Sequence, residues 1–171
     1  MSQVNATSSL SQIMADIDLG PTGSVQFMFA KLQLAQSQIC KNQAESYMSQ
    51  IEQIQEEQKK CAEMIEDARR LQNEAKEGNC CTTMSAEMKE FFSERGLSWD
   101  TAGNNDDQHN SDEWDYNLKS LTNYQEQIGN KTQTLMVYLQ DFIGQYNSYL
   151  QGANTQISNA NQTLTNIARG Q

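Results

Sequence analysis

An acidic cluster is the part of the chain whose residue types best suit metal binding. Asp106, Asp107, Asp112 and Glu113 lie close together in the sequence, and carboxylate oxygens are the ligands that Ca²⁺ and Mg²⁺ prefer. A calcium loop of the EF-hand type also needs a glycine at its sixth position, and this stretch has no such glycine. We therefore interpret the four residues as an exposed acidic surface loop, and we predict no metal site.

Histidine and cysteine give no stronger indication of chemistry. His109 is the only histidine, and it could act as a general base beside these acids, but no serine or cysteine nucleophile with a recognisable motif accompanies it. The cysteines Cys40, Cys61, Cys80 and Cys81 form neither a C-x-x-C pair nor a Cys/His cluster, so we predict free thiols and no zinc site. Glycine-rich phosphate loops are absent too. The sequence predicts a protein that is not an enzyme and holds no cofactor.

Charge excludes some partners. The net charge is −10, of which residues 78–117 carry −7 and residues 118–171 carry +1. No stretch is basic enough to follow a phosphate backbone, so we predict no nucleic-acid partner. No window is apolar enough for a transmembrane segment, and no cleavable secretory signal is recognisable. The protein is thus expected either to stay in the cytosol or to leave by a route that reads another kind of signal.

The elements that would position any site are helical. Residues 1–23 are rich in Ser, Gln, Asn and Thr, which predicts a disordered tail. Ser24 can cap a first long helix over 24–77, and Gly78-Asn79 ends it. Residues 78–117 form an insertion with a short helix from Ser85 to Gly96, after which Leu97 and Trp99 fold back onto the helical pair.

Residues 118–171 are predicted to form the second long helix. Asn110 and Glu113 resemble a capping box that opens it, and apolar residues follow at steps of three and four, with one slip near Tyr146. Only five charged residues occur from Leu118 onward, whereas a solvated helix is normally rich in Glu and Lys. The helix is therefore expected to be buried in an assembly, the alternative being an uncharged helix that faces solvent.

The fold class predicted from these elements is all-α: a long two-helix antiparallel coiled-coil hairpin with a short helix and an acidic loop inserted at its bend. An apolar patch at Val25, Phe27, Met28 and Phe29 indicates a subunit interface, a membrane-touching surface or packing inside the hairpin. The predicted self-assembly interface joins this patch to the stripe of the second helix. Its members are Phe27, Met28, Phe29, Leu32, Leu121, Ile128, Leu135, Leu139, Phe142, Tyr146, Tyr149, Leu150, Ile157, Leu164 and Ile167.

Two short stretches carry a family resemblance. Met28-Phe29-Ala30, followed by Ala35-Gln36-Ser37, resembles the start of the first long helix in the EspA-type and SseB-type filament and translocon subunits of bacterial type III secretion systems. The stretch from Met88 to Leu97 is similar to that family's short amphipathic helix, which ends in a glycine and an apolar residue. The layout of polar tail, long helix, insertion and a second long helix rich in Asn, Gln, Ser and Thr is similar as well.

This resemblance implies a secreted protein, located outside the cell on the bacterial surface, that is exported without cleavage of a signal peptide. It implies polymerisation into a filament that conducts effectors to host cells. The implied partners are further copies of the chain, a dedicated type III secretion chaperone in the cytoplasm, and needle and pore-forming translocator proteins. Two alternatives stay open: a needle-tip or hydrophilic translocator that forms a small oligomer, and a cytosolic coiled-coil adaptor or chaperone.

Overall fold

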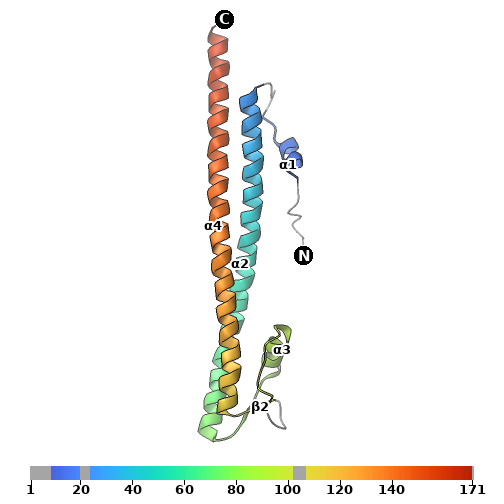
Figure 1. Ribbon diagram of the computed structural model, residues 1–171, viewed down its shortest axis with the longest axis vertical. Helices are drawn as coiled ribbons and strands as arrows, with labels where there is room; N and C mark the ends of the chain where they lie inside the picture. The colour runs from blue at the N-terminus through green and yellow to red at the C-terminus, as the bar shows by residue number, and fades with distance from the viewer. Residues whose placement is uncertain (1–8, 20–23, 102–106, 171) are drawn as a thin grey trace. The chain divides into compact units, whose positions relative to one another are not determined.

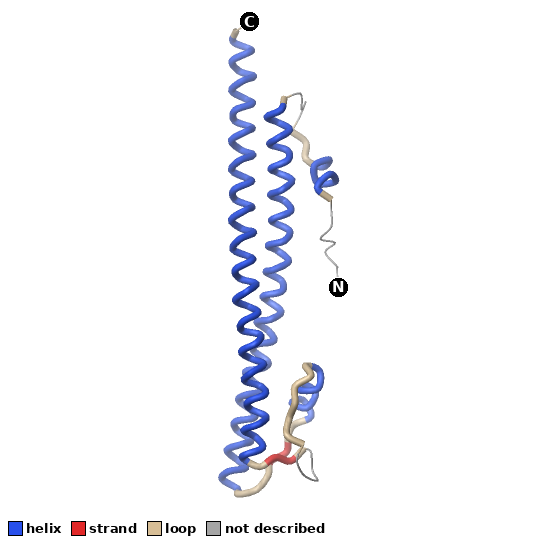
Figure 2. The backbone as a smooth tube through the Cα atoms, in the orientation of Figure 1, coloured by secondary structure: helices blue, strands red, loops and turns tan. Residues whose placement is uncertain are grey.

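Two long helices dominate the fold. The computed structural model describes residues 9–19, 24–101 and 107–170. Helices α2 (Val25–Gly78) and α4 (Ser111–Arg169) pack against each other, which confirms the predicted all-α hairpin (Figure 1). The other elements are short: α1 (Leu10–Asp16), α3 (Ala86–Glu94) and the strands β1 (Thr82–Thr83) and β2 (Gln108–His109), which Figure 2 distinguishes by colour.

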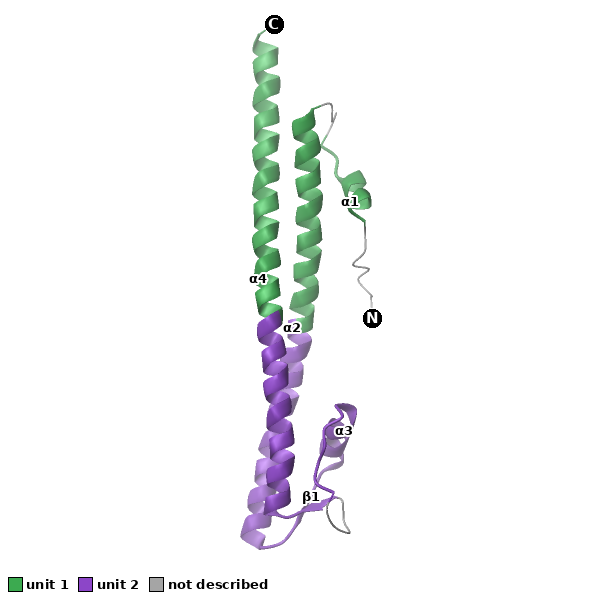
Figure 3. Cartoon of the chain, viewed as in Figure 1, with its two compact units in different colours: residues 1–50, 135–171 green, residues 51–134 purple. Residues whose placement is uncertain are grey.

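The chain divides into two compact units, and both long helices contribute to each. Unit 1 consists of residues 1–50 and 135–171, and unit 2 consists of residues 51–134 (Figure 3).

Helix α2 begins and ends at the predicted signals. The Ser24 hydroxyl accepts a hydrogen bond from the Phe27 N–H at 3.3 Å, which satisfies one of the free amides of the first turn. At the other end Asn79 takes a φ of +44°, and the Cys80 N–H donates to the Ala75 carbonyl at 3.1 Å. That left-handed residue and its backward hydrogen bond terminate the helix in the way that the Gly-Asn pair predicts.

Local capping also fixes the ends of α3 and the start of α4. The Ser85 hydroxyl accepts from the Met88 N–H at 3.1 Å, and Gly96 takes a φ of +63° just past the end of α3. The Asn110 side chain accepts from the Glu113 N–H at 3.0 Å, while the Glu113 carboxylate accepts from the Asn110 N–H at 2.8 Å. The predicted capping box is confirmed, and it starts α4 at Ser111, earlier than the predicted boundary at residue 118.

Unit 2 contains a core of large side chains. Met84, Met88, Phe92, Trp114 and Leu121 are all at most 2% exposed. The residues predicted to fold back, Leu97 and Trp99, pack against this core. Met64 and Ile65 of α2 belong to the same core, so apolar groups from α2, α3 and α4 hold unit 2 together by burial.

A two-stranded antiparallel ribbon in unit 2 was not predicted. Thr82 pairs with His109 and Thr83 with Gln108, and the Trp114 indole N–H donates to the Thr82 hydroxyl at 2.8 Å. Two-residue strands are too short to show an alternating pattern in the sequence.

Unit 1 is an antiparallel helix pair with α1 beside it. The Cys40 thiol donates to the Gln145 side chain at 3.8 Å, and the Tyr47 and Phe142 rings stack with centroids 5.7 Å apart. Residues later in α2 therefore contact residues earlier in α4, as in an antiparallel pair.

The prediction of a disordered tail is wrong for part of residues 1–23. Helix α1 lies within this segment, and it starts with a capping box in which the Ser9 hydroxyl accepts from the Gln12 N–H while the Gln12 side chain accepts from the Ser9 N–H. Residues 1–8 and 20–23 lie outside the described residues. The S-x-x-Q spacing was the signal for this helix.

Candidate functional site

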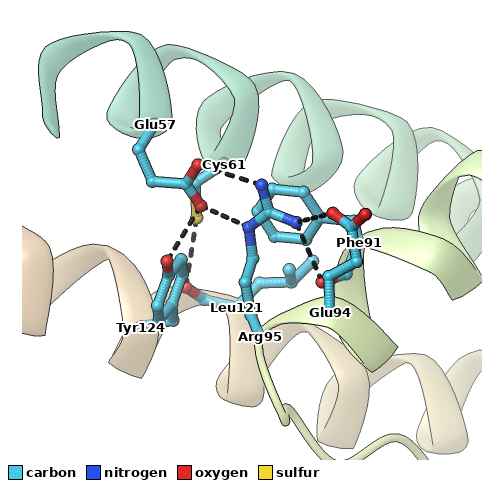
Figure 4. Close-up of polar contacts among 7 residues, drawn as sticks. All are labelled: Glu57, Cys61, Phe91, Glu94, Arg95, Leu121 and Tyr124. Atoms are coloured by element: carbon cyan, nitrogen blue, oxygen red, sulfur yellow. Dashed lines mark hydrogen bonds and ion pairs between the residues drawn. The ribbon is translucent and has the colours of Figure 1, made fainter. Parts of the chain in front are cut away.

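A polar cluster in unit 2 has the residue types of a reactive site. Arg95, just past α3, makes an ion pair with Glu57 of α2 through two of its nitrogens, one of them Nη2 at 2.9 Å (Figure 4). The Tyr124 hydroxyl of α4 donates to the same carboxylate at 2.8 Å. The Arg95 guanidinium also lies 3.8 Å from the centre of the Phe91 ring, a favourable cation–π geometry. The cluster thus joins α2, α3 and α4.

The charges and the burial in this cluster favour, for each group, the protonation state that it normally has at neutral pH. Hydrogen bonds from Arg95 lower the pKa of Glu57, and those to Glu57 raise the pKa of Arg95. Burial and the bond to Glu57 raise the pKa of Tyr124 to about 12. Burial, with the charge of Glu57, raises the pKa of Cys61 to about 11. A thiol is nucleophilic only as the thiolate, so this arrangement suits an anchor for α3 better than nucleophilic catalysis.

The predicted acidic loop is partly wrong. Asp112 and Glu113 lie in the first turn of α4, where the helix dipole favours negative charge, and Glu113 is half-buried in the capping box. Asp107 is half-buried and forms an ion pair with Lys89 at 2.8 Å. Asp106 lies outside the described residues. Within the part of the chain that the structure describes, no three His, Cys, Asp or Glu side chains gather as a metal site.

His109 is an internal residue of unit 2. Its side chain is 1% exposed and its ring meets that of Trp114 edge-on, with centroids 5.1 Å apart. Burial lowers the pKa of His109, and its Nε2 atom has no hydrogen-bond partner among the described residues. Such a ring is closed off from any substrate in solution.

The predicted free thiols are confirmed. Cys40 and Cys61 are buried on α2, and Cys80 and Cys81 are exposed after it.

Unit 1 has an unusual distribution of side-chain size. Its buried residues are mostly small, and Leu135 is the largest of them. They are Ala30, Ala35, Ser37, Cys40, Ala44, Leu135, Ala153 and Ala160. Small residues let two helix backbones approach closely, but they bury little apolar area.

Many of the large apolar side chains of unit 1 are exposed. Twelve large hydrophobic residues are exposed among those that the structure describes, and all except Tyr116 belong to unit 1. We call these eleven the unit 1 apolar surface: Leu10, Val25, Met28, Phe29, Met48, Met136, Val137, Tyr138, Ile143, Leu164 and Ile167. A cluster of exposed apolar residues in one region usually marks an interaction site.

Charge separates the two units in the same way. Three basic and four acidic residues fall in unit 1, against nine and eighteen in unit 2, so the net charges are −1 and −9. Unit 2 has the many charged residues that are typical of a solvated protein. Unit 1 has few charged residues that would oppose contact between its apolar residues and a partner.

The predicted interface residues fall into three groups. Leu121, Ile128 and Leu135 are at most 8% exposed within one chain, so in this conformation they are not available to a second chain. Eight others are half-buried: Phe27, Leu32, Leu139, Phe142, Tyr146, Tyr149, Leu150 and Ile157. Met28, Phe29, Leu164 and Ile167 are exposed and belong to the unit 1 apolar surface.

Sequence reasoning missed part of this surface. Met136 and Ile143 are 47% and 42% exposed, and they begin a second stripe on α4 that continues at steps of seven through Leu150, Ile157 and Leu164. That heptad spacing could have identified the second stripe, but the neighbouring stripe has more apolar residues and was predicted to be the interface.

None of the described helices has a stretch long and apolar enough to cross a membrane. No family model, no curated protein and no solved structure matches the chain. The resemblance to the EspA-type subunits therefore rests on the short stretches and the layout described above.

Proposed function

We propose that the chain is a non-enzymatic structural subunit that assembles with copies of itself through the unit 1 apolar surface. The observation that carries the proposal is the size of the buried and exposed side chains in unit 1. Alanines are buried there, whereas large residues such as Phe29 and Val137 are 55% and 63% exposed. Covering one such half-exposed side chain contributes roughly 1 kcal/mol, so association of several of them drives assembly.

The sparse charge of unit 1 supports the same proposal. Between Leu135 and Gln171 the sequence has only Asp141 and Arg169 as charged residues. Copies that approach through this surface bury few charges, which avoids the large desolvation cost of unpaired ions. The acidic unit 2 stays in solvent.

Within this proposal, the resemblance to EspA-type subunits assigns the assembly to a type III secretion filament or translocon outside the bacterial cell. A protein with such a surface needs a cytoplasmic chaperone to cover it before export. A small closed oligomer at the needle tip is the second form that the same surface could give, and a cytosolic adaptor is the alternative outside secretion.

Sedimentation velocity and negative-stain microscopy of the purified full-length chain test the proposal. We expect mass to grow with protein concentration, and assembly to persist from 0.1 to 1 M NaCl and to weaken on cooling, because apolar burial drives it. Filaments would support the polymer, and a discrete ring the tip assembly. A compact monomer at high concentration would contradict self-assembly, and assembly that dissolves in high salt would contradict the apolar surface.

A further inference from the structure

The last turns of α4 have no partner among the residues of unit 1 that the structure describes. The Gln33 side chain lies against Gly152, and Cys40 contacts Gln145. Seven residues further along α2 therefore correspond to seven residues back along α4. This register puts Val25, the first residue of α2, level with residue 160 of α4. The residues beyond, 161–170, are all exposed and extend about 15 Å past that point (Figure 1). We call residues 161–170 the α4 tail.

The α4 tail continues an apolar stripe that is already packed. Ala153 and Ala160, seven residues apart, are 0% and 1% exposed, because α2 covers them. Ile167 comes seven residues later and is 59% exposed, and Leu164 beside it is 53% exposed. The stripe therefore goes on where α2 has ended, and a further helix is needed to cover it.

A matching apolar turn lies at the start of α2. Val25, Met28 and Phe29 are 66%, 60% and 55% exposed at helical spacing, while Ala30 is fully buried. We call these three residues the α2 face. None of the described residues covers the large side chains of the α2 face, and neither this face nor the α4 tail has an acidic residue.

The described part of the N-terminal segment does not cover either surface. Ile13 and Ile17 line a groove together with Leu34, Tyr146 and Leu150, further along the helix pair. Where the stripe on α4 is packed, α2 covers it, so the exposed start of α2 in a second copy is the part of this chain that suits the α4 tail.

From the packing of α2 on the same stripe of α4 we infer that the α4 tail of one copy packs on the α2 face of a neighbouring copy. The inference rests on the proposed self-assembly and specifies which residues meet. Because a tail meets a face, and not a second tail, each added copy leaves one unused tail and one unused face. A contact of this heterologous kind extends into an open polymer unless the rotation between copies closes a ring.

Mixing two variants of the full-length chain tests the inference. Phe29→Asp spoils the face and keeps the tail, whereas Leu164→Asp spoils the tail and keeps the face. Each alone is expected to raise the concentration needed for assembly at least about tenfold, because each would bury an unpaired carboxylate. An equimolar mixture is expected to form two-chain species and to stop there, since the intact tail of the first fits the intact face of the second.

Gln162→Asp is the matched control. It adds the same charge to the same tail, but its position is about 200° around the axis from Leu164, and it is expected to assemble as the wild type does. Circular dichroism and thermal unfolding check that all three variants fold.

If the wild type assembles, three results would overturn the inference. These are a mixture that stays monomeric, a mixture that forms polymers as long as those of the wild type, and a single variant that assembles at the wild-type concentration. A wild-type chain that stays monomeric would overturn the proposed function together with the inference.

Discussion

Replacing Leu135 and Leu164 by aspartate, one at a time, separates folding from assembly. The two leucines lie on the same helix, but Leu135 is 7% exposed and Leu164 is 53% exposed. Truncating a buried leucine costs about 2–5 kcal/mol, and a carboxylate left in its place adds a desolvation cost. We expect Leu135→Asp to lower the free energy of unfolding by at least about 3 kcal/mol, which is a large part of the stability of an ordinary domain. Leu164→Asp should change it by no more than about 0.5 kcal/mol.

Urea denaturation followed by circular dichroism, at a protein concentration below that of assembly, measures both values. Sedimentation at higher concentration then reports assembly, which Leu164→Asp should block in a chain that is otherwise folded. The reasoning is refuted if the two variants lose the same stability, because burial within the chain would then not distinguish the two positions. It is refuted as well if Leu164→Asp assembles at the wild-type concentration.

Two further predictions concern unit 2. Glu57→Gln should lower the free energy of unfolding by about 1–2 kcal/mol at neutral pH, because the Arg95 side chain, 15% exposed, loses one of its two charged partners and keeps only the more exposed Glu94. Since the pKa of Glu57 lies below its ordinary value of 4.5 in the folded chain, this contribution is complete above that value and is lost as the pH falls through the folded pKa. The difference between variant and wild type should therefore shrink in urea titrations as the pH falls below the ordinary value of 4.5, and a constant difference would contradict the ion pair. Iodoacetamide should alkylate the exposed Cys80 and Cys81 in the native protein, but Cys61, which is 0% exposed, only after unfolding; mass spectrometry that finds Cys61 labelled at a similar rate in the folded chain would contradict its buried, protonated state.

Local signals predicted the helix ends well. Ser24, Ser85 and the Asn110–Glu113 pair each act within one helical turn, so the sequence alone contains the whole interaction. The same reasoning, applied to the Ser9 and Gln12 pair, would have found α1.

Periodicity could not predict which part of an apolar stripe is used within the chain. Leu135 and Leu164 look alike in the sequence, and only the register of α2 against α4, which depends on distant contacts, leaves the second one uncovered. The apolar pattern also did not predict that the buried residues of unit 1 are small. An apolar pattern draws attention to side chains such as Phe142, whereas the close approach of two helices selects Ala153 and Ala160 for the inside.

Methionine oxidation tests the central claim on the unaltered chain. Met28, Met48 and Met136 belong to the unit 1 apolar surface, and peroxide should oxidise them quickly in dilute protein. Met84 and Met88 in the core of unit 2 are at most 2% exposed and serve as internal references. If copies associate through unit 1, assembled protein should show at least one of the three exposed methionines, Met28 first, oxidised several-fold more slowly than in dilute protein. Equal rates for all three in the dilute and assembled protein would contradict the account.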